Sequence, residues 1–330
     1  MGAGMKSWWM QVADGVAMLE LKDTQQPQPG PTQLLVRMRA ASLNRGEFIL
    51  AHGLHSKGTG AKAVGMEAAG EVVACGASVT QFKVGDKVLG RCPGAFAECA
   101  LMDEREAMAM PGNLSWQEAA SIPLVLLVVF DMLVLQGKLR RDEWMLVAGV
   151  TSGVGVGSLQ LAKALDAKVI GTSGSQVKLD RLAGLGLDVG LCTRSPDFHD
   201  AVLRATGGKG ANLVVNAVGG SVFAECVKSM AFEGRLATVG YVDGVMRGDM
   251  DIEALHAKRL TLFGVSNKLR SADQKAQSLP AFRAEVLPMI AQGRFTPLVD
   301  KSFAFEHLAQ AKAFMDDNQQ VGKIVLNGLV

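Results

Sequence analysis

The pattern of hydrophobic and polar positions changes at about residue 130. Before it, short apolar runs such as 34–41 alternate with glycine turns, which predicts short strands. Ser115 and Glu118 have capping-box spacing, which predicts a helix within 111–123 that Pro123 ends. After it, strands are expected at 144–148, 168–172, 212–215, 235–239 and 261–265, alternating with helices at 156–165, 178–185 and 222–230. This alternation predicts βαβ units and a parallel sheet.

The last part of the chain has helical spacing at 279–292 and 305–316, and then a predicted strand at 322–326. A length of 330 residues favours two domains. Hydrophobic residues make up 48% and charged residues 20%, which is typical of a soluble globular protein. The net charge is +2 and the cations are spread along the chain, so we expect no nucleic-acid partner and no anionic membrane partner.

The cysteines and the apolar segments bear on the compartment. The five cysteines are Cys75, Cys92, Cys99, Cys192 and Cys226, with no Cys-x-x-Cys pair. This favours a reducing compartment over a disulfide framework. The first ten residues lack the apolar core of a signal peptide, and the stretch 122–135 is shorter than the ~20 residues that span a bilayer. We expect a cytoplasmic protein.

A glycine-containing turn follows the predicted strand at 144–148 and precedes the helix at 156–165. A strand, a tight turn and a helix N-terminus together form an anion site, because the backbone and the helix dipole face the ligand. The usual Gly-x-Gly-x-x-Gly is incomplete, since Val150 and Ser152 occupy its first two glycine positions before Gly155. The segment is therefore either a dinucleotide-binding turn or an ordinary turn whose glycines serve packing. The βαβ context favours the first interpretation.

The second predicted strand bears on the choice of cofactor. NAD enzymes place Asp or Glu at its end to bind the ribose hydroxyls. Here no acid occurs between Asp166 and Asp180. The small hydroxyl residues leave room for a 2′-phosphate, with Lys178 and then Arg194 as candidate partners, although Lys178 can also be read as a solvated helix residue. The missing acid favours NADPH over NADH.

Motifs spread over the chain carry a family resemblance. They are 41–44 (ASLN), 65–70 (GMEAAG), 84–88 (VGDKV), 94–98 (GAFAE), 114–120 (LSWQEAA), 122–123 (IP), 160–163 (QLAK), 218–220 (VGG), 234–235 (GR) and 322–326 (GKIVL). With these motifs in this order, the chain resembles the medium-chain dehydrogenase/reductase superfamily, in its zinc-free quinone oxidoreductase (zeta-crystallin-like) branch.

The resemblance implies an α/β fold with a GroES-like β-rich catalytic domain at 1–125 and 267–330. A Rossmann domain with a doubly wound parallel sheet is inserted at 126–266, and the active site lies in the cleft between the domains. The resemblance also implies a homodimer that pairs Rossmann sheet edges.

The resemblance further implies a set of site residues. Those that bind the cofactor are Asn44, Val128, Thr151, Ser152, Gly153, Val154, Gly155, Ser173, Lys178, Arg194, Val218, Gly240, Tyr241, Phe263, Val265 and Lys323. Asn44 and Tyr241 are the catalytic candidates. Relatives carry Gly at position 152, often Thr at 128 and often Asp at 216, where this chain has Ser152, Val128 and Asn216.

Zinc-dependent relatives bind their catalytic metal with a Cys near position 44 and a His in Gly-His-Glu. This chain has Asn44 and, in Gly65-Met66-Glu67, a methionine in the His position. Cys92 and Cys99 are all that corresponds to the four-cysteine structural zinc lobe, so we expect no metal. Without that Lewis acid, hydride transfer to an acceptor that is already electron-poor remains the expected chemistry.

The acceptor is predicted to be a quinone or similar activated small molecule, with Asn44 orienting the nicotinamide or the substrate. Enoyl-thioester reductases carry a proton-donating Tyr within the stretch that corresponds to 48–56, which has none here. His52 and His55 either donate protons or are solvated, and Tyr241 either faces the nicotinamide or packs. The alternatives are an NADPH-dependent enone or alkenal reductase and a non-catalytic NADPH-binding protein.

Overall fold

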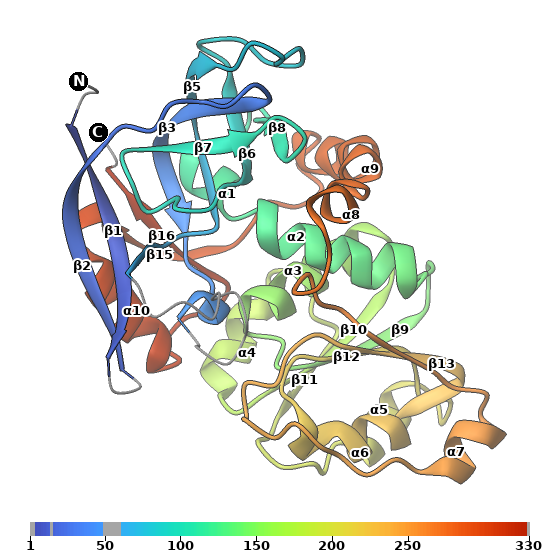
Figure 1. The fold of residues 1–330 in the computed structure, drawn as a ribbon. Helices are drawn as coiled ribbons and strands as arrows, with labels where there is room; N and C mark the ends of the chain where they lie inside the picture. Colours follow the sequence, from blue (N-terminus) through green and yellow to red (C-terminus); the bar gives the residue numbers. More distant parts are fainter. Residues whose placement is uncertain (1–3, 14–15, 49–60, 329–330) are drawn as a thin grey trace. The chain divides into compact units, whose positions relative to one another are not determined.

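The computed structural model describes residues 4–13, 16–48 and 61–328, and it divides into two compact units (Figure 1). Unit 1 comprises residues 1–127 and 270–330, and unit 2 comprises residues 128–269. The sequence-based boundaries, 125/126 and 266/267, fall close to these.

Unit 1 is built on mainly antiparallel strands, although its last two strands pair in parallel. The hairpin of β1 (Gly4–Ala13) and β2 (Val16–Gln25) joins β4 (Lys62–Ala63) in a small sheet. The larger sheet has the order β15-β16-β3-β5-β6-β8, and β7 pairs with β3. Its strands are β3 (Gln33–Ser42), β5 (Glu67–Cys75), β6 (Lys87–Arg91), β7 (Cys99–Asp103), β8 (Ala107–Ala109), β15 (Val299–Ala304) and β16 (Lys323–Asn327). The last strand, β16, runs antiparallel to β3, so the two ends of the unit form one sheet.

Unit 1 also contains several helices, most of them short. They are η1 (Arg45–Glu47), α1 (Trp116–Ala120), α8 (Ala272–Ala276), α9 (Leu279–Ala291), η5 (Phe305–His307) and α10 (Leu308–Asp316). The capping box is present, since the Ser115 hydroxyl accepts the Glu118 N–H and the Glu118 carboxylate accepts the Ser115 N–H. The expected helix at 111–123 is shorter than predicted. Pro123 instead begins α2 (Pro123–Phe130), because a first-turn position needs no N–H, and a π-helical segment, η3 (Asp131–Gln136), follows.

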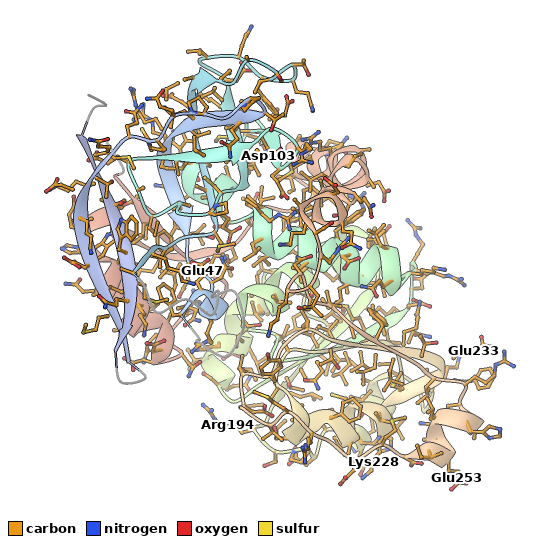
Figure 2. All side chains as sticks on the ribbon, in the orientation of Figure 1. Glu47, Asp103, Arg194, Lys228, Glu233 and Glu253 are labelled. Atoms are coloured by element: carbon orange, nitrogen blue, oxygen red, sulfur yellow. The ribbon has the colours of Figure 1, made fainter. Side chains whose placement is uncertain are left out.

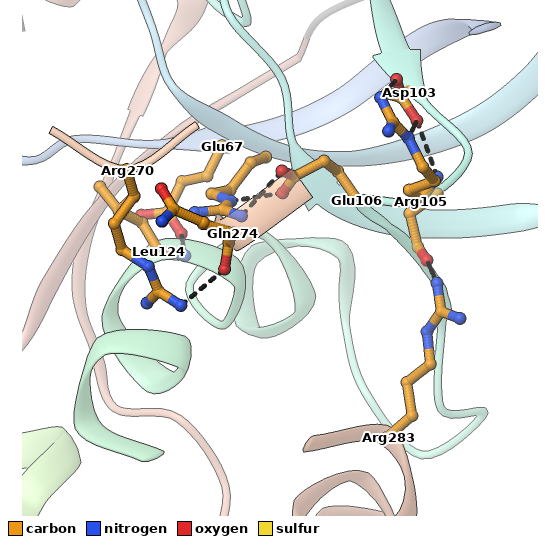
Figure 3. A network of polar contacts seen from close by, with 10 residues as sticks. Glu67, Asp103, Arg105, Glu106, Leu124, Arg270, Gln274 and Arg283 are labelled. Carbon is orange, nitrogen blue, oxygen red and sulfur yellow. Dashed lines mark hydrogen bonds and ion pairs between the residues drawn. The ribbon is translucent and has the colours of Figure 1, made fainter. Parts of the chain in front are cut away.

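Polar contacts join the C-terminal helices of unit 1 to its strands (Figure 3). The Arg105 guanidinium lies 2.7 Å from Asp273 Oδ1 at the start of α8. The Arg283 guanidinium of α9 donates to the carbonyl of Ala107. The Asn113 amide donates to the Ile290 carbonyl at 2.9 Å. These contacts fix the returning tail against the β-rich part.

Unit 2 is a parallel sheet with the order β11-β10-β9-β12-β13-β14. Its strands are β9 (Trp144–Ala148), β10 (Lys168–Ser173), β11 (Val189–Cys192), β12 (Ala211–Asn216), β13 (Met230–Thr238) and β14 (Thr261–Gly264). In chain order this is 3-2-1-4-5-6, the doubly wound Rossmann order, and it confirms the predicted fold class. Its topological switch point lies between β9 and β12.

The helices of unit 2 are α3 (Gly153–Ala164), α4 (Gln176–Ala183), α5 (His199–Ala205), η4 (Gly220–Val222), α6 (Phe223–Lys228) and α7 (Ile252–Ala257). Side chains of α5 and α6, such as Val202 and Cys226, pack with Leu146 and Val214 of the central strands in one buried cluster. No helix in the described ranges has the length and apolar character needed to cross a bilayer.

Candidate functional site

Ser152 forms the N-cap of α3 in unit 2. Its hydroxyl accepts the Gly155 N–H at 3.1 Å and donates to the Gly149 carbonyl at 2.9 Å. Its backbone is extended, with φ −72° and ψ 165°, which any residue can adopt. Serine therefore replaces the usual glycine here without strain, and it satisfies one of the unpaired N–H groups at the helix start.

The second departure from the glycine pattern, Val150, also has a structural reason. Val150 is fully buried, and a Cβ placed on Gly171 of β10 would lie 2.6 Å from its Cγ1. The valine therefore fills space that Gly171 leaves open. The glycines that the turn requires are Gly149, with φ +84°, and Gly155, whose added Cβ would lie 2.4 Å from the Gly149 carbonyl oxygen.

The turn lies at the switch point of the sheet, beside the segment that follows β12. The Ala217 N–H donates to the Ala148 carbonyl at 3.3 Å. The Asn216 amide holds the next residues, accepting from the N–H groups of Val218 and Gly219 and donating to the Gly219 carbonyl at 2.9 Å. An aspartate could not make this last bond as a carboxylate. The open turn, the twelve-residue α3 and the switch point fit a dinucleotide pyrophosphate.

The end of β10 gathers the residues expected at the 2′-phosphate. The hydroxyls of Thr151 and Ser173 lie 3.5 Å apart. A Cβ on Gly174 would meet Arg194 Nε at 2.4 Å, so the exposed Arg194 side chain lies over the strand end (Figure 2). Lys178 follows in α4 and is half-buried. The next acid, Asp180, accepts a hydrogen bond from the Gln176 amide at 2.8 Å. Two cations and small hydroxyls at this strand end fit a phosphate.

The remaining expected cofactor residues of unit 2 lie at the same edge of the sheet. Val218 follows β12, Gly240 and Tyr241 follow β13, and Phe263 and Val265 lie at the end of β14, all at the carboxyl ends of their strands. Gly153 and Val154 form the first turn of α3, and Val128 is on α2. Ligands of doubly wound sheets bind at this edge.

A second group of predicted residues forms a buried polar cluster in unit 1, centred on Glu67. Glu67 is 0% exposed. Its Oε1 accepts from the Ser42 hydroxyl at 2.5 Å and from Asn44 Nδ2 and Lys323 Nζ at 2.8 Å each. Its Oε2 accepts the Leu124 N–H at the start of α2 at 2.6 Å (Figure 3). Four donors and the charge of Lys323 stabilise this buried carboxylate.

Lys323 and Asn44 are bound to this cluster. The Lys323 ammonium contacts Glu67, the Leu43 carbonyl at 3.0 Å and Asn44 Oδ1 at 2.8 Å, which uses its three N–H bonds. Asn44 Nδ2 donates to both Glu67 and Glu47. Sequence analysis predicted Asn44 and Lys323 as cofactor contacts and named Glu67 only within a motif. The ion pair of Lys323 with Glu67, and the hydrogen bond of Asn44 to the same carboxylate, could not be predicted because these residues lie far apart in the chain.

Glu47, on η1, is a functional candidate that sequence analysis missed. It is 3% exposed (labelled in Figure 2), its Oε1 accepts from Asn44 Nδ2 at 2.8 Å, and its Oε2 is buried without a hydrogen-bond partner among the described residues. Burial, with a smaller contribution from Glu67, raises the pKa of Glu47 to about 8 although Asn44 and Lys323 oppose the rise. Glu47 is therefore mainly a neutral acid at pH 7. The signal in the sequence that could have indicated this residue is the three-residue spacing of Glu47 from Asn44, which lets their side chains form a hydrogen bond.

The residues at the positions of the zinc ligands have other roles here. The Met66 carbonyl accepts the Cys92 N–H at 2.8 Å, and the Cys92 thiol donates to the Leu101 carbonyl at 3.2 Å. Burial raises the pKa of Cys92 to about 12, whereas a metal ligand must be a thiolate. Within the described ranges, no three His, Cys, Asp or Glu residues are grouped so as to hold a metal. His52 and His55 lie outside the described residues.

The fold and the turn define a two-unit protein with a dinucleotide-type Rossmann sheet, and comparisons with known proteins give its family. Residues 30–117 match the alcohol dehydrogenase GroES-like domain and residues 153–279 match the family described as zinc-binding dehydrogenase. The chain belongs to the medium-chain dehydrogenase/reductase superfamily.

Curated relatives include the phthioceranic/hydroxyphthioceranic acid synthase of Mycobacterium tuberculosis, which is 29% identical over 94% of this chain. The reducing polyketide synthase FUB1 of Gibberella fujikuroi is 28% identical over 95% of this chain. The chain spans only 14% and 13% of the lengths of these two relatives.

Solved structures match over nearly their whole length. A quinone oxidoreductase of Pseudomonas syringae pv. Tomato DC3000 is 28% identical, with a TM-score of 0.86 over 98% of this chain and 99% of that chain. A mycobacterial protein in complex with NADPH is 26% identical, with a TM-score of 0.86 over 98% of this chain and 99% of that chain.

Proposed function

We propose that the chain is an NADPH-dependent reductase that passes hydride to a quinone or a similar activated acceptor without a metal. The observation that carries this proposal is the turn 149–155, which opens α3 at the switch point of a Rossmann sheet. The likeness to a quinone oxidoreductase and to a protein in complex with NADPH supports it.

The N–H groups at the start of α3, from Gly153 to Gly155, would bind the pyrophosphate with Ser152 fixing the turn. Ser173, Lys178 and Arg194 would bind the 2′-phosphate, and this set would distinguish NADPH from NADH. Bound NADPH supplies the hydride. The residues after β12, β13 and β14, including Tyr241, would orient the nicotinamide, and Asn44 would orient the acceptor.

The donor set of unit 1 supports chemistry without zinc. Asn44 and Met66 stand where metal ligands would be needed, and Glu67 is saturated by four donors. A hydride acceptor must then be electron-poor before it binds, which favours a quinone. The likeness to a reducing polyketide synthase favours a second candidate, reduction of an α,β-unsaturated carbonyl.

Steady-state oxidation of NADPH with 1,4-benzoquinone and, separately, with a 2-alkenal tests the proposal. We expect turnover of the quinone. Strong turnover of alkenals or enoyl thioesters with no quinone activity would establish the second candidate instead. Quenching of NADPH fluorescence without turnover of any acceptor would show a non-catalytic NADPH-binding protein.

We also propose that the protein forms a homodimer through β14, the strand at one edge of the parallel sheet. An open edge pairs readily with another strand, and Leu262 on β14 is an exposed apolar side chain at 36%. Light scattering after size exclusion measures the mass, and L262K should shift it from dimer toward monomer. A wild-type monomer would refute the dimer.

A further inference from the structure

Among the residues that the structure describes, the cluster in unit 1 holds two buried carboxyl groups and one buried ammonium. Lys323 lies 2.8 Å from Glu67, which also accepts three further hydrogen bonds. Glu47 receives neutral hydrogen bonds from the side chain and the backbone of Asn44 and contacts no cation directly among the described residues. An unpaired buried carboxylate is far less stable than the neutral acid. The charge balance of these described residues therefore favours a protonated Glu47 at neutral pH.

The hydrogen bonds also locate that proton. Glu47 Oε1 accepts from Asn44 Nδ2, so the acidic hydrogen resides on Oε2. Oε2 is buried and has no partner among the described residues. Asn44 cannot turn its amide elsewhere, because Nδ2 also bridges to Glu67 and Oδ1 accepts from Lys323. The cluster thus orients a neutral O–H donor for which the described part of the chain supplies no acceptor.

We propose that Glu47 is the general acid of the reductase, with Oε2 donating its proton to the carbonyl oxygen of the quinone or enone. The inference rests on the proposed function, which places the acceptor at Asn44. In the step, the Glu47 O–H bond breaks and an O–H bond forms on the acceptor. The hydride from NADPH brings both electrons, so the acceptor is reduced and NADPH is oxidised. The Glu47 carboxylate then regains a proton from water.

The substitution E47Q tests this role with little change in shape. Glutamine keeps an oxygen for the Asn44 bond and an N–H in place of the O–H, but it cannot give up a proton. E71Q is the matched control, because Glu71 lies on β5, the strand that also carries Glu67, and pairs with Arg39 while remaining part-exposed. Each variant is measured for melting temperature, NADPH affinity by fluorescence, and kcat/KM with benzoquinone against pH.

We expect E47Q to bind NADPH as the wild type does and to lose about 100-fold or more of kcat/KM at pH 7. The wild-type profile should fall above about pH 8, where Glu47 ionises, and E47Q should lose this limb while E71Q retains it. Infrared spectra of the wild type and of E47Q are recorded without cofactor at pH 7 and subtracted. The difference should show the carbonyl band of a protonated carboxylic acid that is present in the wild type and missing in E47Q.

Three results overturn the proposal. Activity of E47Q within threefold of an active wild type refutes the general acid and leaves the reductase function standing. Absence of the carboxylic acid band at pH 7 refutes the stored proton independently of turnover. A wild-type chain that binds NADPH and reduces neither quinones nor enones refutes the reductase function, and the role of Glu47 with it.

Discussion

Arg194 lies over Gly174, so closely that a Cβ on the glycine would come within 2.4 Å of the guanidinium Nε. The loop after β11 thus places a cation at the end of β10 only because residue 174 has no side chain. Since an arginine side chain can move away, G174V should displace Arg194 and leave the fold intact. We expect weaker binding of NADPH with unchanged binding of NADH. Fluorescence titration of both cofactors measures this, and an equal change for both would contradict the placement.

Lys178 offers an independent test of the 2′-phosphate site. K178A should weaken NADPH binding by about 1.5–3 kcal/mol, the usual contribution of a charge-assisted phosphate contact, and leave NADH nearly unchanged. The same titration checks it, with K275A on α8 of unit 1 as a control lysine. Equal losses for both cofactors would show that Lys178 does not contact this phosphate.

The ion pair of Lys323 and Glu67 should dominate the stability of unit 1. K323M leaves Glu67 buried without a counter-charge, which typically costs about 3–5 kcal/mol. Unfolding in urea, followed by circular dichroism, measures the loss. The double variant K323M/E67Q removes both charges and should recover part of the stability. A single variant as stable as the wild type would show that the pair contributes little.

Two glycines of unit 2, Gly155 in the turn and Gly184 at the end of α4, differ sharply in their surroundings. G155A places a Cβ 2.4 Å from the Gly149 carbonyl oxygen, so the backbone must shift. We expect a loss of about 1–3 kcal/mol in unfolding free energy and weaker nucleotide binding. G184A, where a Cβ meets nothing within 4 Å, is the control and should change neither property. Tight NADPH binding by G155A would contradict the assigned role of the turn.

The pH dependence of stability reports on Glu47 without any cofactor. Its pKa is about 8 in the folded protein and close to 4.5 when unfolded, so between these values only the folded state holds the proton. Stability from this group is therefore full below about pH 4.5 and declines up to about pH 8, by roughly 1.4 kcal/mol per pH unit at most. E47Q should remove this decline. Urea unfolding of both proteins from pH 5 to pH 9 measures it, and parallel curves would refute the raised pKa.

The elements of unit 2 could largely be predicted because its core strands are continuous apolar runs. The strand predicted at 144–148 matches β9, and the alternation revealed the parallel sheet. The four-residue β11 was missed because its positions alternate between half-buried and exposed, as on an edge. Helix α2 was missed because proline was read only as a terminator.

The two candidate sites differed in how much the sequence could reveal. The nucleotide turn is local, so its residues are consecutive, although the fit of Val150 to Gly171 required the structure. The cluster of Glu67, Asn44, Glu47 and Lys323 depends on pairing between β16 and β3, which brings Lys323 Nζ to the Leu43 carbonyl, 280 positions away in the chain. No local pattern in the sequence encodes that proximity, and the raised pKa of Glu47 comes mainly from burial, with a smaller contribution from Glu67.

The pairing of β16 with β3 also bears on the order of folding during synthesis. Residues 128–269 are contiguous, so unit 2 can complete its sheet as soon as it leaves the ribosome. Unit 1 must wait for Lys323, and until then Glu67 lacks its counter-charge. Nascent chains that end before β16 should therefore hold a folded nucleotide unit beside an incomplete β-rich unit, which leaves the edge of β3 as a site for chaperone contact or aggregation.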